Sequence, residues 1–389
     1  MACVPRFCSD TSHILSPTSR LKAIRNGFSR HKLTVRVPVM QSSEGHLKIQ
    51  LVALGNGVWL DEIRREGDAN IKDVPGGSVT FATLGARLFA ADCTDTIGMV
   101  FKAGHDFPES IVDIFRSWSI DLTVQWLPDS PASRGLVFYE KANNNRKGFQ
   151  RLTKPLPVTV AELQGTTLQA TSAFEFFGSA EYVEEQVTDI VSLRQQLGGD
   201  YASTQPFIVW EPYPKSCLPD TLSKHQHVAR LVNVFSPNHE ELHSFFGEPT
   251  AAVDPIVIEG QAQCFVDAGI GPHGDGCIVV RAAGHGCVVL SKHMSACWFP
   301  PFYPADSENV VDATGAGNAF LGAFAVGWQK TQSYVEAAAY GTVAASFALE
   351  QVGLPLRSGE GSGELWNGCS VENRLAEYRQ RIRGKRLAE

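Results

Sequence analysis

The sequence predicts an α/β fold, in which a mostly parallel, doubly wound sheet carries helices on both faces and is joined to a small β lid. Three observations predict this class. Short apolar runs alternate with segments of helical periodicity along most of the 389 residues. Hydrophobic residues make up 43% of the chain and charged residues 19%, which is enough apolar surface for a large core. Two segments, 58–73 and 122–141, carry strand patterns without obvious crossover helices, so we assign them to the lid.

The expected elements follow one another from residue 47. Strands are predicted where short aliphatic runs are bounded by Gly, Asn or Pro, and helices where apolar or small residues recur every three to four positions. Residues 277–290 are expected to form a hairpin, turned by Gly284-His285-Gly286. The predicted strands are 47–54, 58–60, 97–101, 122–126, 136–139, 206–210 and 231–235, and the predicted helices are 79–89, 110–117, 183–197, 240–246, 315–328 and 333–352.

The two ends of the chain differ from this central segment, 47–356. Residues 1–40 hold seven Lys and Arg against one acidic residue, so we expect a basic, disordered extension over 1–46. A cytoplasmic protein is the main expectation, and a mitochondrial one is the alternative, because transit peptides are also basic and poor in acids. Residues 357–389 begin with a Gly/Ser-rich linker and end in a charged helix. We expect this tail to lie outside the core.

Charge and cysteine content exclude several classes of protein. The formal net charge of −7 argues against nucleic acid or an anionic membrane as the main partner. No apolar run approaches the roughly 18 residues of a membrane-spanning helix. The nine Cys are scattered, odd in number and without a C-x-x-C pair, which favours reduced thiols over a disulfide framework.

The most informative stretch is 311–320, Val-Asp-Ala-Thr-Gly-Ala-Gly-Asn-Ala-Phe. Three small residues, Gly315, Ala316 and Gly317, open directly onto an apolar helix. Glycines let the backbone N–H groups of a helix N-terminus approach a charged oxygen, and the helix dipole favours the negative charge. The stretch therefore predicts an anion-binding site at the start of this helix.

The same stretch resembles the second signature of the ribokinase/PfkB carbohydrate kinase family, Asp-x-Thr-Gly-Ala-Gly-x-x-Phe. Other landmarks of that family occur in the correct order between residues 51 and 354. The resemblance implies a ribokinase-like fold. The landmarks are Gly76-Gly77 followed by Ala86-Arg87-Leu88 (first signature), Glu211-Pro212 (an Asp-Pro element), Pro237-Asn238-His239-Glu240-Glu241 (Pro-Asn-x-x-Glu) and the nucleotide-side strand and turn 279–286.

The resemblance also implies a reaction, the ATP-dependent transfer of a phosphoryl group to a hydroxyl of a small sugar- or nucleoside-like acceptor. It assigns a role to each matching position. Substrate binding would fall to Asp61, Gly76, Gly77 and Thr80, phosphoryl transfer to Gly315, Ala316, Gly317 and Asn318, and nucleotide binding to Arg281, Ala283, Gly284 and Gly286.

Two cations are implied as well. Glu241 would support Mg²⁺ through water, and Asp312 would help to bind a monovalent cation such as K⁺. The implied partners are ATP and the small-molecule acceptor, and a homodimer formed through the lid is a further option.

The departures from the family pattern matter equally. Asn318 stands where the family keeps its catalytic Asp, and an amide cannot accept a proton. A general base contributes about 10²–10⁴ in rate, but phosphoryl transfer depends mainly on positioning and charge stabilisation, so Asn318 could still orient the acceptor. Thr80 replaces a sugar-binding Asn, and Ala283 replaces a Gly.

Asn at this position is typical of the fungal PfkB-like subgroup related to the yeast maintenance-of-killer protein, which the chain also resembles. The alternative function is therefore a catalytically weak or inactive homologue that acts as a ligand sensor or assembly partner.

One rival motif overlaps the position of Glu241. His239-Glu240-Glu241-Leu242-His243 is a literal H-E-x-x-H on a predicted helix. In zinc proteases the two His of this motif hold the metal, and the Glu acts as the base. A zinc site therefore remains an alternative use of this helix.

Overall fold

In the computed structural model, the described residues are 51–65, 70–139 and 146–388, so the expected N-terminal extension lies outside them. They form one large sheet, a smaller sheet and a short hairpin of β14 (Arg357–Ser358) and β15 (Leu365–Trp366). The large sheet has nine strands. In spatial order these are β13 (Met294–Phe299), β12 (Cys287–Ser291), β11 (Cys277–Arg281), β10 (Val234–Phe235), β9 (Phe207–Pro212), β8 (Ala173–Gly178), β1 (Leu51–Leu54), β4 (Ile97–Gly104) and β5 (Asp121–Leu127).

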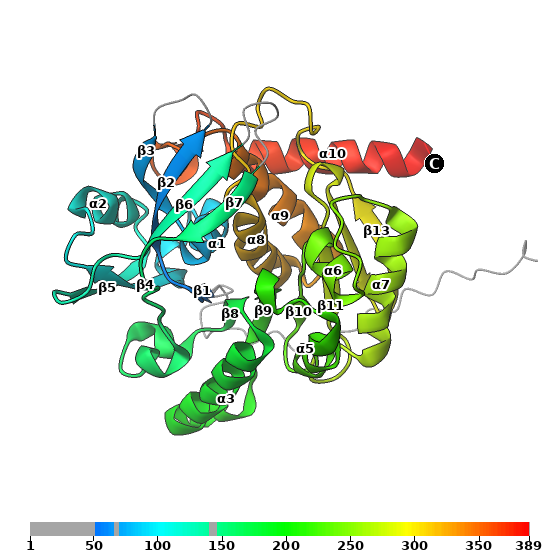
Figure 1. Cartoon of the computed structure of the whole chain (residues 1–389), viewed down its shortest axis with the longest axis horizontal. Helices are drawn as coiled ribbons and strands as arrows, with labels where there is room; N and C mark the ends of the chain where they lie inside the picture. The colour runs from blue at the N-terminus through cyan, green and yellow to red at the C-terminus, as the bar shows by residue number, and fades with distance from the viewer. Residues whose placement is uncertain (1–50, 66–69, 140–145, 389) are drawn as a thin grey trace, which may run out of the picture. The chain divides into compact units, whose positions relative to one another are not determined.

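The large sheet is doubly wound, as the sequence predicts. Every neighbouring pair from β5 to β11 is parallel, and only β12 and β13 are added in the antiparallel sense. From β1 the chain builds β4 and β5 on one side, then returns to β8 and continues toward β11 on the other (Figure 1). The carboxyl ends of β1 and β8 therefore mark the switch point, where open α/β sheets bind their ligands.

Side chains alternate between two cores, one on each face of the sheet. Leu51 and Ala53 of β1 face one hydrophobic cluster, and Val52 and Leu54 face the other, because successive side chains of a strand point to opposite sides. The first cluster is covered by α1 (Ser78–Leu88), α2 (Glu109–Ser117), α8 (Ala316–Thr331), α9 (Tyr334–Leu349) and α10 (Val371–Ala388). The second is covered by α3 (Ala180–Leu197), α5 (Leu222–Ala229), α6 (His239–Phe245) and α7 (Pro255–Ala268).

Helices α1 and α8 pack unusually closely. A Cβ on Gly85 would lie 1.9 Å from the carbonyl oxygen of Ala319, and one on Gly322 would lie 1.8 Å from that of Ala82. Only glycine fits at these two crossing points. The close contact fixes α1 and α8 relative to each other on one face of the sheet.

The smaller sheet forms the lid. Its order is β3-β2-β6-β7, and β2 pairs in parallel with β6. The sequence placed the lid at 58–73 and 122–141, and the second of these segments needs a correction. Residues 121–127 form β5 and pair in parallel with β4, so they belong to the large sheet. The lid strands are β2 (Trp59–Arg65), β3 (Ile71–Gly76), β6 (Arg134–Tyr139) and β7 (Arg146–Arg151).

The C-terminal tail is part of the core, which corrects the expectation that residues after 356 lie outside it. Trp366, Leu375 and Tyr378 are at most 1% exposed and belong to the first hydrophobic cluster. The buried Arg374 donates a hydrogen bond to Ser346 on α9. Charge does not mark α10 as exposed, because Arg374 and Arg379 lie over the rings of Phe347 and Tyr340 on α9. Among the described helices, none combines the length and apolar character that a membrane crossing requires.

Candidate functional site

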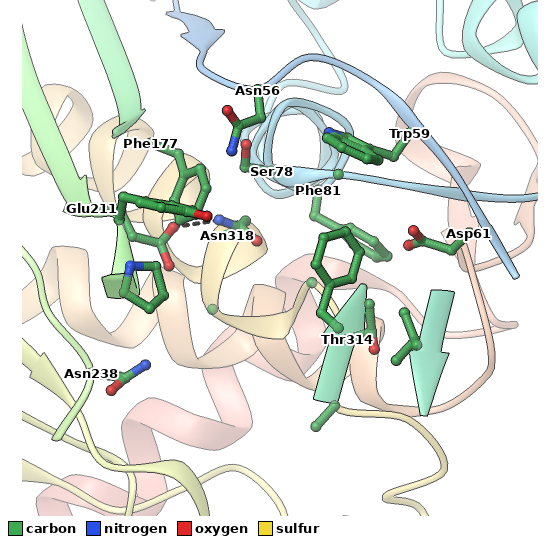
Figure 2. A pocket seen from close by; sticks show the side chains of 18 of the residues that line it. Asn56, Trp59, Asp61, Ser78, Phe81, Phe177, Glu211, Asn238, Thr314 and Asn318 are labelled. Carbon is green, nitrogen blue, oxygen red and sulfur yellow. Dashed lines mark hydrogen bonds between the residues drawn. The ribbon is translucent and has the colours of Figure 1, made fainter. Parts of the chain in front are cut away.

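A cavity of about 370 Å³ lies at the carboxyl ends of the strands, beneath the lid. Its walls come from the lid, from the N-terminal turns of α1 and α8, and from the ends of β9 and β11 (Figure 2). It therefore brings together segments that are far apart in the chain. Among the residues to which the sequence assigned a role, those lining the cavity are Asp61, Gly77, Glu241, Arg281, Gly315, Gly317 and Asn318.

The first turn of α8 has the geometry of an anion site. Gly315 is the N-cap residue and adopts a φ of 77°, in the left-handed region that favours glycine. A Cβ on Gly317 would lie 2.3 Å from Nη1 of Arg281. The turn thus combines the partial positive charge of a 16-residue helix with the guanidinium of Arg281, whose side chain is 12% exposed, and both favour an anionic ligand.

Arg281, at the end of β11, is held by three partners. Its Nη1 lies 2.8 Å from Oε1 of Glu211, and its Nη2 donates to the carbonyl oxygen of Ser236 at 3.0 Å. Glu241 is more distant, with Oε2 3.6 Å from Nη2. Burial disfavours the charge of this arginine, but the neighbouring Glu211 and Glu241 carboxylates outweigh that effect and raise its pKa. Arg281 therefore stays charged inside the cavity wall.

Asn318, in the first turn of α8, faces the end of β9. Its Nδ2 donates a hydrogen bond to Oε2 of Glu211, and Figure 2 shows this contact on the side of the cavity opposite Asp61. The carboxylate accepts only, so the amide must turn its nitrogen toward Glu211 and its oxygen away from it. Burial raises the pKa of Glu211, although Arg281 and Asn318 both act in the opposite direction.

Two acidic residues have the character of cation ligands. Glu241 is 5% exposed, and its Oε2 accepts the backbone N–H of Asn238 at 2.8 Å. Burial raises its pKa to about 8, so its ionised form lacks a full counter-charge. Asp312 is 2% exposed, and its Oδ1 accepts from the N–H of Thr314 at 2.8 Å and from the hydroxyl of Tyr139. The other oxygen, Oδ2, is buried without a hydrogen-bond partner among the described residues.

Asp61 and a group of aromatic rings also line the cavity. Asp61 lies on β2 and is 4% exposed. A Cβ on Gly76 would lie 2.0 Å from its Oδ2, so the glycine makes room for the carboxylate. A carboxylate accepts hydrogen bonds from hydroxyl groups, and aromatic faces suit the apolar face of a sugar ring or a base. The rings that line the cavity are those of Trp59, Phe81, Phe149, Phe177 and Tyr213.

Some residues named from the sequence do not line the cavity. The Thr80 hydroxyl donates to the carbonyl of Gly76 at 2.7 Å and is buried within α1. Ala283, Gly284 and Gly286 lie in the turn that joins β11 to β12, which begins two residues after Arg281. Of the remaining positions, Gly76, Asp312 and Ala316 are each next in sequence to a lining residue.

The two histidines of the H-E-x-x-H motif are engaged elsewhere. His243 contacts Oε1 of Gln261 through Nδ1 at 2.8 Å and the carbonyl of Ala252 through Nε2 at 3.2 Å. His239 contacts the carbonyl of Ala251 at 3.1 Å. Within the described part of the chain, no group of three or more His, Cys, Asp or Glu is arranged to hold a metal ion. Both histidines tie α6 to the segment that follows it.

Among the residues in or beside the cavity that have no role assigned from the sequence, three make polar contacts that bear on the site. In the sequence, Glu211 is only part of an Asp-Pro-like element. The pairing of β9 with β8 and the hydrogen bond to Asn318 on α8 place its carboxylate in the cavity wall. Tyr139 reaches Asp312 from the lid. Arg151, also from the lid, lies 3.2 Å from the hydroxyl of Tyr213. A polar residue at the carboxyl end of a predicted parallel strand was the signal that could have found Glu211.

Known proteins share both the sequence pattern and the fold. The model of the pfkB family carbohydrate kinases matches residues 69–356. An uncharacterized protein of Schizosaccharomyces pombe is 31% identical over 339 residues, covering 82% of this chain and 90% of its own. Protein MAK32 of Saccharomyces cerevisiae is 27% identical over 358 residues, covering 87% and 95%.

Solved structures show the same ribokinase-like fold. Ribokinase from Giardia lamblia superposes with a TM-score of 0.63 at 13% identity, covering 85% of this chain and 99% of that one. A putative ribokinase II from E. coli in complex with ATP and Mg²⁺ gives 0.59 at 16% identity, covering 86% and 99%. The family match and the fungal relatives show that the chain belongs to the pfkB family of carbohydrate kinases, in a fungal PfkB-like subgroup.

Proposed function

We propose that the protein transfers a phosphoryl group from ATP to a hydroxyl of a small sugar- or nucleoside-like acceptor. The observation that carries the proposal is the cavity itself. The glycine-lined N-terminus of α8 and the mostly buried Arg281 lie on one side of a cavity of about 370 Å³. Asp61, a carboxylate suited to bind hydroxyl groups, lies on the other side. An anionic donor and a hydroxylated acceptor thus have separate, opposed sites within one cavity.

The residues present fit the cations that such a reaction uses. Glu241 lines the cavity with a buried carboxylate whose charge is only partly balanced, and Mg²⁺ takes oxygen ligands of this kind, often through water. The Oδ2 of Asp312, which has no hydrogen-bond partner among the described residues, suits a monovalent cation such as K⁺. When bound, Mg²⁺ would neutralise phosphate charge. The chain's own part is to hold the donor at α8 and the acceptor at Asp61.

One observation favours a second candidate function. Arg281 and Glu211 already neutralise each other inside the cavity, and the residue beside them is Asn318, not an acid. A protein that keeps the ligand site but transfers no phosphoryl group would tolerate this arrangement. A catalytically weak or inactive homologue, acting as a ligand sensor or assembly partner, is therefore the alternative.

Nucleotide binding is the first test. ATP with Mg²⁺ should raise the melting temperature, because a ligand that binds only the folded state increases the free energy of unfolding by about 2.7 kcal/mol at about 100 times its Kd. Gly317→Ala should reduce that rise, since the new methyl group would displace Arg281 and crowd the anion site. Gly260→Ala is a matched control, because a Cβ there on α7 meets nothing within 4 Å. No rise in the wild type at millimolar ATP would exclude a nucleotide-dependent function.

Turnover separates the two candidates. Wild-type protein would be incubated with ATP and Mg²⁺ and a panel of pentoses, hexoses and nucleosides, and phosphorylated products would be identified by mass spectrometry. A phosphorylated product establishes the kinase. ATP binding without any product or ATP hydrolysis favours the sensor.

A further inference from the structure

The cavity contains one carboxylate to which the family pattern gives no catalytic role, and it touches the residue that replaces the expected base. Glu211 lines the cavity near the end of β9, with its side chain 8% exposed. Its Oε2 accepts the hydrogen bond from Nδ2 of Asn318 (Figure 2). A hydroxyl that contacts the Asn318 amide is therefore also within reach of the Glu211 carboxylate.

We propose that Glu211 accepts the proton of the acceptor hydroxyl, while Asn318 orients that hydroxyl and the carboxylate. This inference rests on the proposed kinase function. In the reaction, the O–H bond of the acceptor breaks and its proton moves to Glu211. The oxygen forms a bond to the γ-phosphorus, and the bond from that phosphorus to the β-γ bridging oxygen breaks, so ADP leaves with the electron pair.

Electrostatics explain why an amide, not an acid, accompanies Glu211. Two carboxylates in contact cannot both ionise, because each raises the pKa of the other. With Asn318 beside it, Glu211 has an uncharged donor on one oxygen and the guanidinium of Arg281 on the other. Both contacts favour the ionised form, which is the form that can accept a proton. Glu211 on β9 and Asn318 on α8 thus form a hydrogen-bonded carboxylate–amide pair.

The groups around Glu211 set its proton affinity. They are Arg281 on β11, Asn318 on α8, Glu175 on β8 and Glu241 on α6. Burial works against ionisation of Glu211, and Arg281 and Asn318 work for it. Burial outweighs the pairing, so the pKa of Glu211 is raised above its ordinary value, and a carboxylate is a better base when its pKa moves toward the working pH.

The test exchanges the two members of the pair. Glu211→Gln keeps the size of the side chain and removes the base, so kcat should fall by about 10²–10⁴. The double variant Glu211→Gln/Asn318→Asp keeps one amide and one carboxylate in contact, and it should recover kcat to within about tenfold of the wild type. Glu240→Gln, an exposed neighbour of Glu241 on α6, is the matched control and should leave kcat unchanged.

Two further readouts distinguish a proton acceptor from a residue that only holds Arg281. The acid limb of the pH profile of kcat should be lost in Glu211→Gln and return in the exchanged pair. The thermal shift by ATP with Mg²⁺ should be retained in both variants. The assays would follow phosphate release from ATP, with water as the acceptor, and product formation from the panel of pentoses, hexoses and nucleosides.

The remaining outcomes decide against the inference. If Glu211→Gln keeps kcat within threefold of the wild type, Glu211 is not the proton acceptor, and the kinase function stands. If only variants that carry Asn318→Asp turn over, Glu211 is not competent as a base. If no variant turns over while ATP still binds, the proposed function fails, and the inference falls with it.

Discussion

Asn318 and Glu211 join the first turn of α8 to the end of β9 through a hydrogen bond from the amide nitrogen to the carboxylate. The contact links the N-terminal turn of α8 to β9, and the other carboxylate oxygen of Glu211 pairs with Arg281. A change at either residue therefore alters the charge balance of the whole cavity wall. Both residues also allow tests of stability that need no substrate.

Asn318→Asp should make stability more sensitive to pH. The new carboxylate would lie against Glu211, and the pair would share a proton in the folded state. Because the folded state then binds a proton that the unfolded chain has released above about pH 4.5, its stability falls as pH rises. The melting temperature of the variant should drop further below the wild type at pH 8 than at pH 5.5. Asn318→Ala, which also loses the hydrogen bond but adds no charge, should show the same deficit at both pH values.

Glu175 predicts a second, independent pH effect. It is fully buried on β8, and neither of its carboxylate oxygens has a hydrogen-bond partner among the described residues. Burial raises its pKa well above the ordinary value, with Glu211 adding to the effect. The folded state thus retains a proton that the unfolded chain loses above about pH 4.5, so this residue makes the protein less stable as pH rises from there.

Glu175→Gln should remove that dependence, because a neutral amide takes no part in the proton balance. The free energy of unfolding of the variant, relative to the wild type, should increase from pH 5 to pH 8 by up to about 1.4 kcal/mol per pH unit. Chemical denaturation at four pH values in this range measures it. Parallel curves for the two proteins would show that Glu175 is ionised in the folded state or already has a counter-charge.

Much of the fold was predictable because its signals are local. Residues 206–210 form one apolar run, 277–290 form two apolar runs joined by a Gly-containing turn, and the helices after Gly77 and Gly315 begin at glycine turns. Helix α7 was missed, although Asp254 as N-cap and Pro255 at the first helical position mark its start. The assignment of 122–126 to the lid failed because a strand pattern does not say which sheet its partner belongs to.

The sequence predicted the cavity residues that belong to a local motif. It did not predict those that reach the cavity only through tertiary contacts. Gly317 and Asn318 were found from one stretch of sequence, and both line the cavity. Glu211 depends on the register of β9 and on a contact with a residue 107 positions away, which no local pattern contains. The burial of α10 was hidden for a similar reason, since its sequence is charged and only the surface of α9 shows which face is covered.

The contacts of the two α6 histidines indicate that they stabilise the fold without a metal ion. Each of the two ring nitrogens of His243 contacts an oxygen of a side chain or carbonyl, and a metal ion would have to displace one of these contacts. Incubation with a chelator and dialysis should leave the melting temperature unchanged. His243→Ala should lower it, because Gln261 loses its buried partner, at a cost of about 1–3 kcal/mol. A chelator-induced loss of stability that zinc restores would contradict this assignment.

The C-terminal helix stabilises the core through Tyr378. Tyr378 is fully buried against the core, and its hydroxyl donates to the carbonyl of Pro300 at 2.6 Å. Tyr378→Ala should reduce the free energy of unfolding by about 3–5 kcal/mol, the range for removing a large aromatic ring from a core. Glu377→Ala, at an exposed neighbouring position, should change it by less than about 0.5 kcal/mol.

Truncation extends the same argument to the whole tail. Removing every residue after Arg357 would uncover the apolar surface that Trp366, Leu375 and Tyr378 now fill, and it would take away Glu364, the buried partner of Arg87. An unpaired buried charge and an open core face are each strongly destabilising. The shortened chain should therefore aggregate on expression, or melt far below the full chain. A soluble product with an unchanged melting temperature and unchanged near-ultraviolet circular dichroism would show that α10 is dispensable for the core.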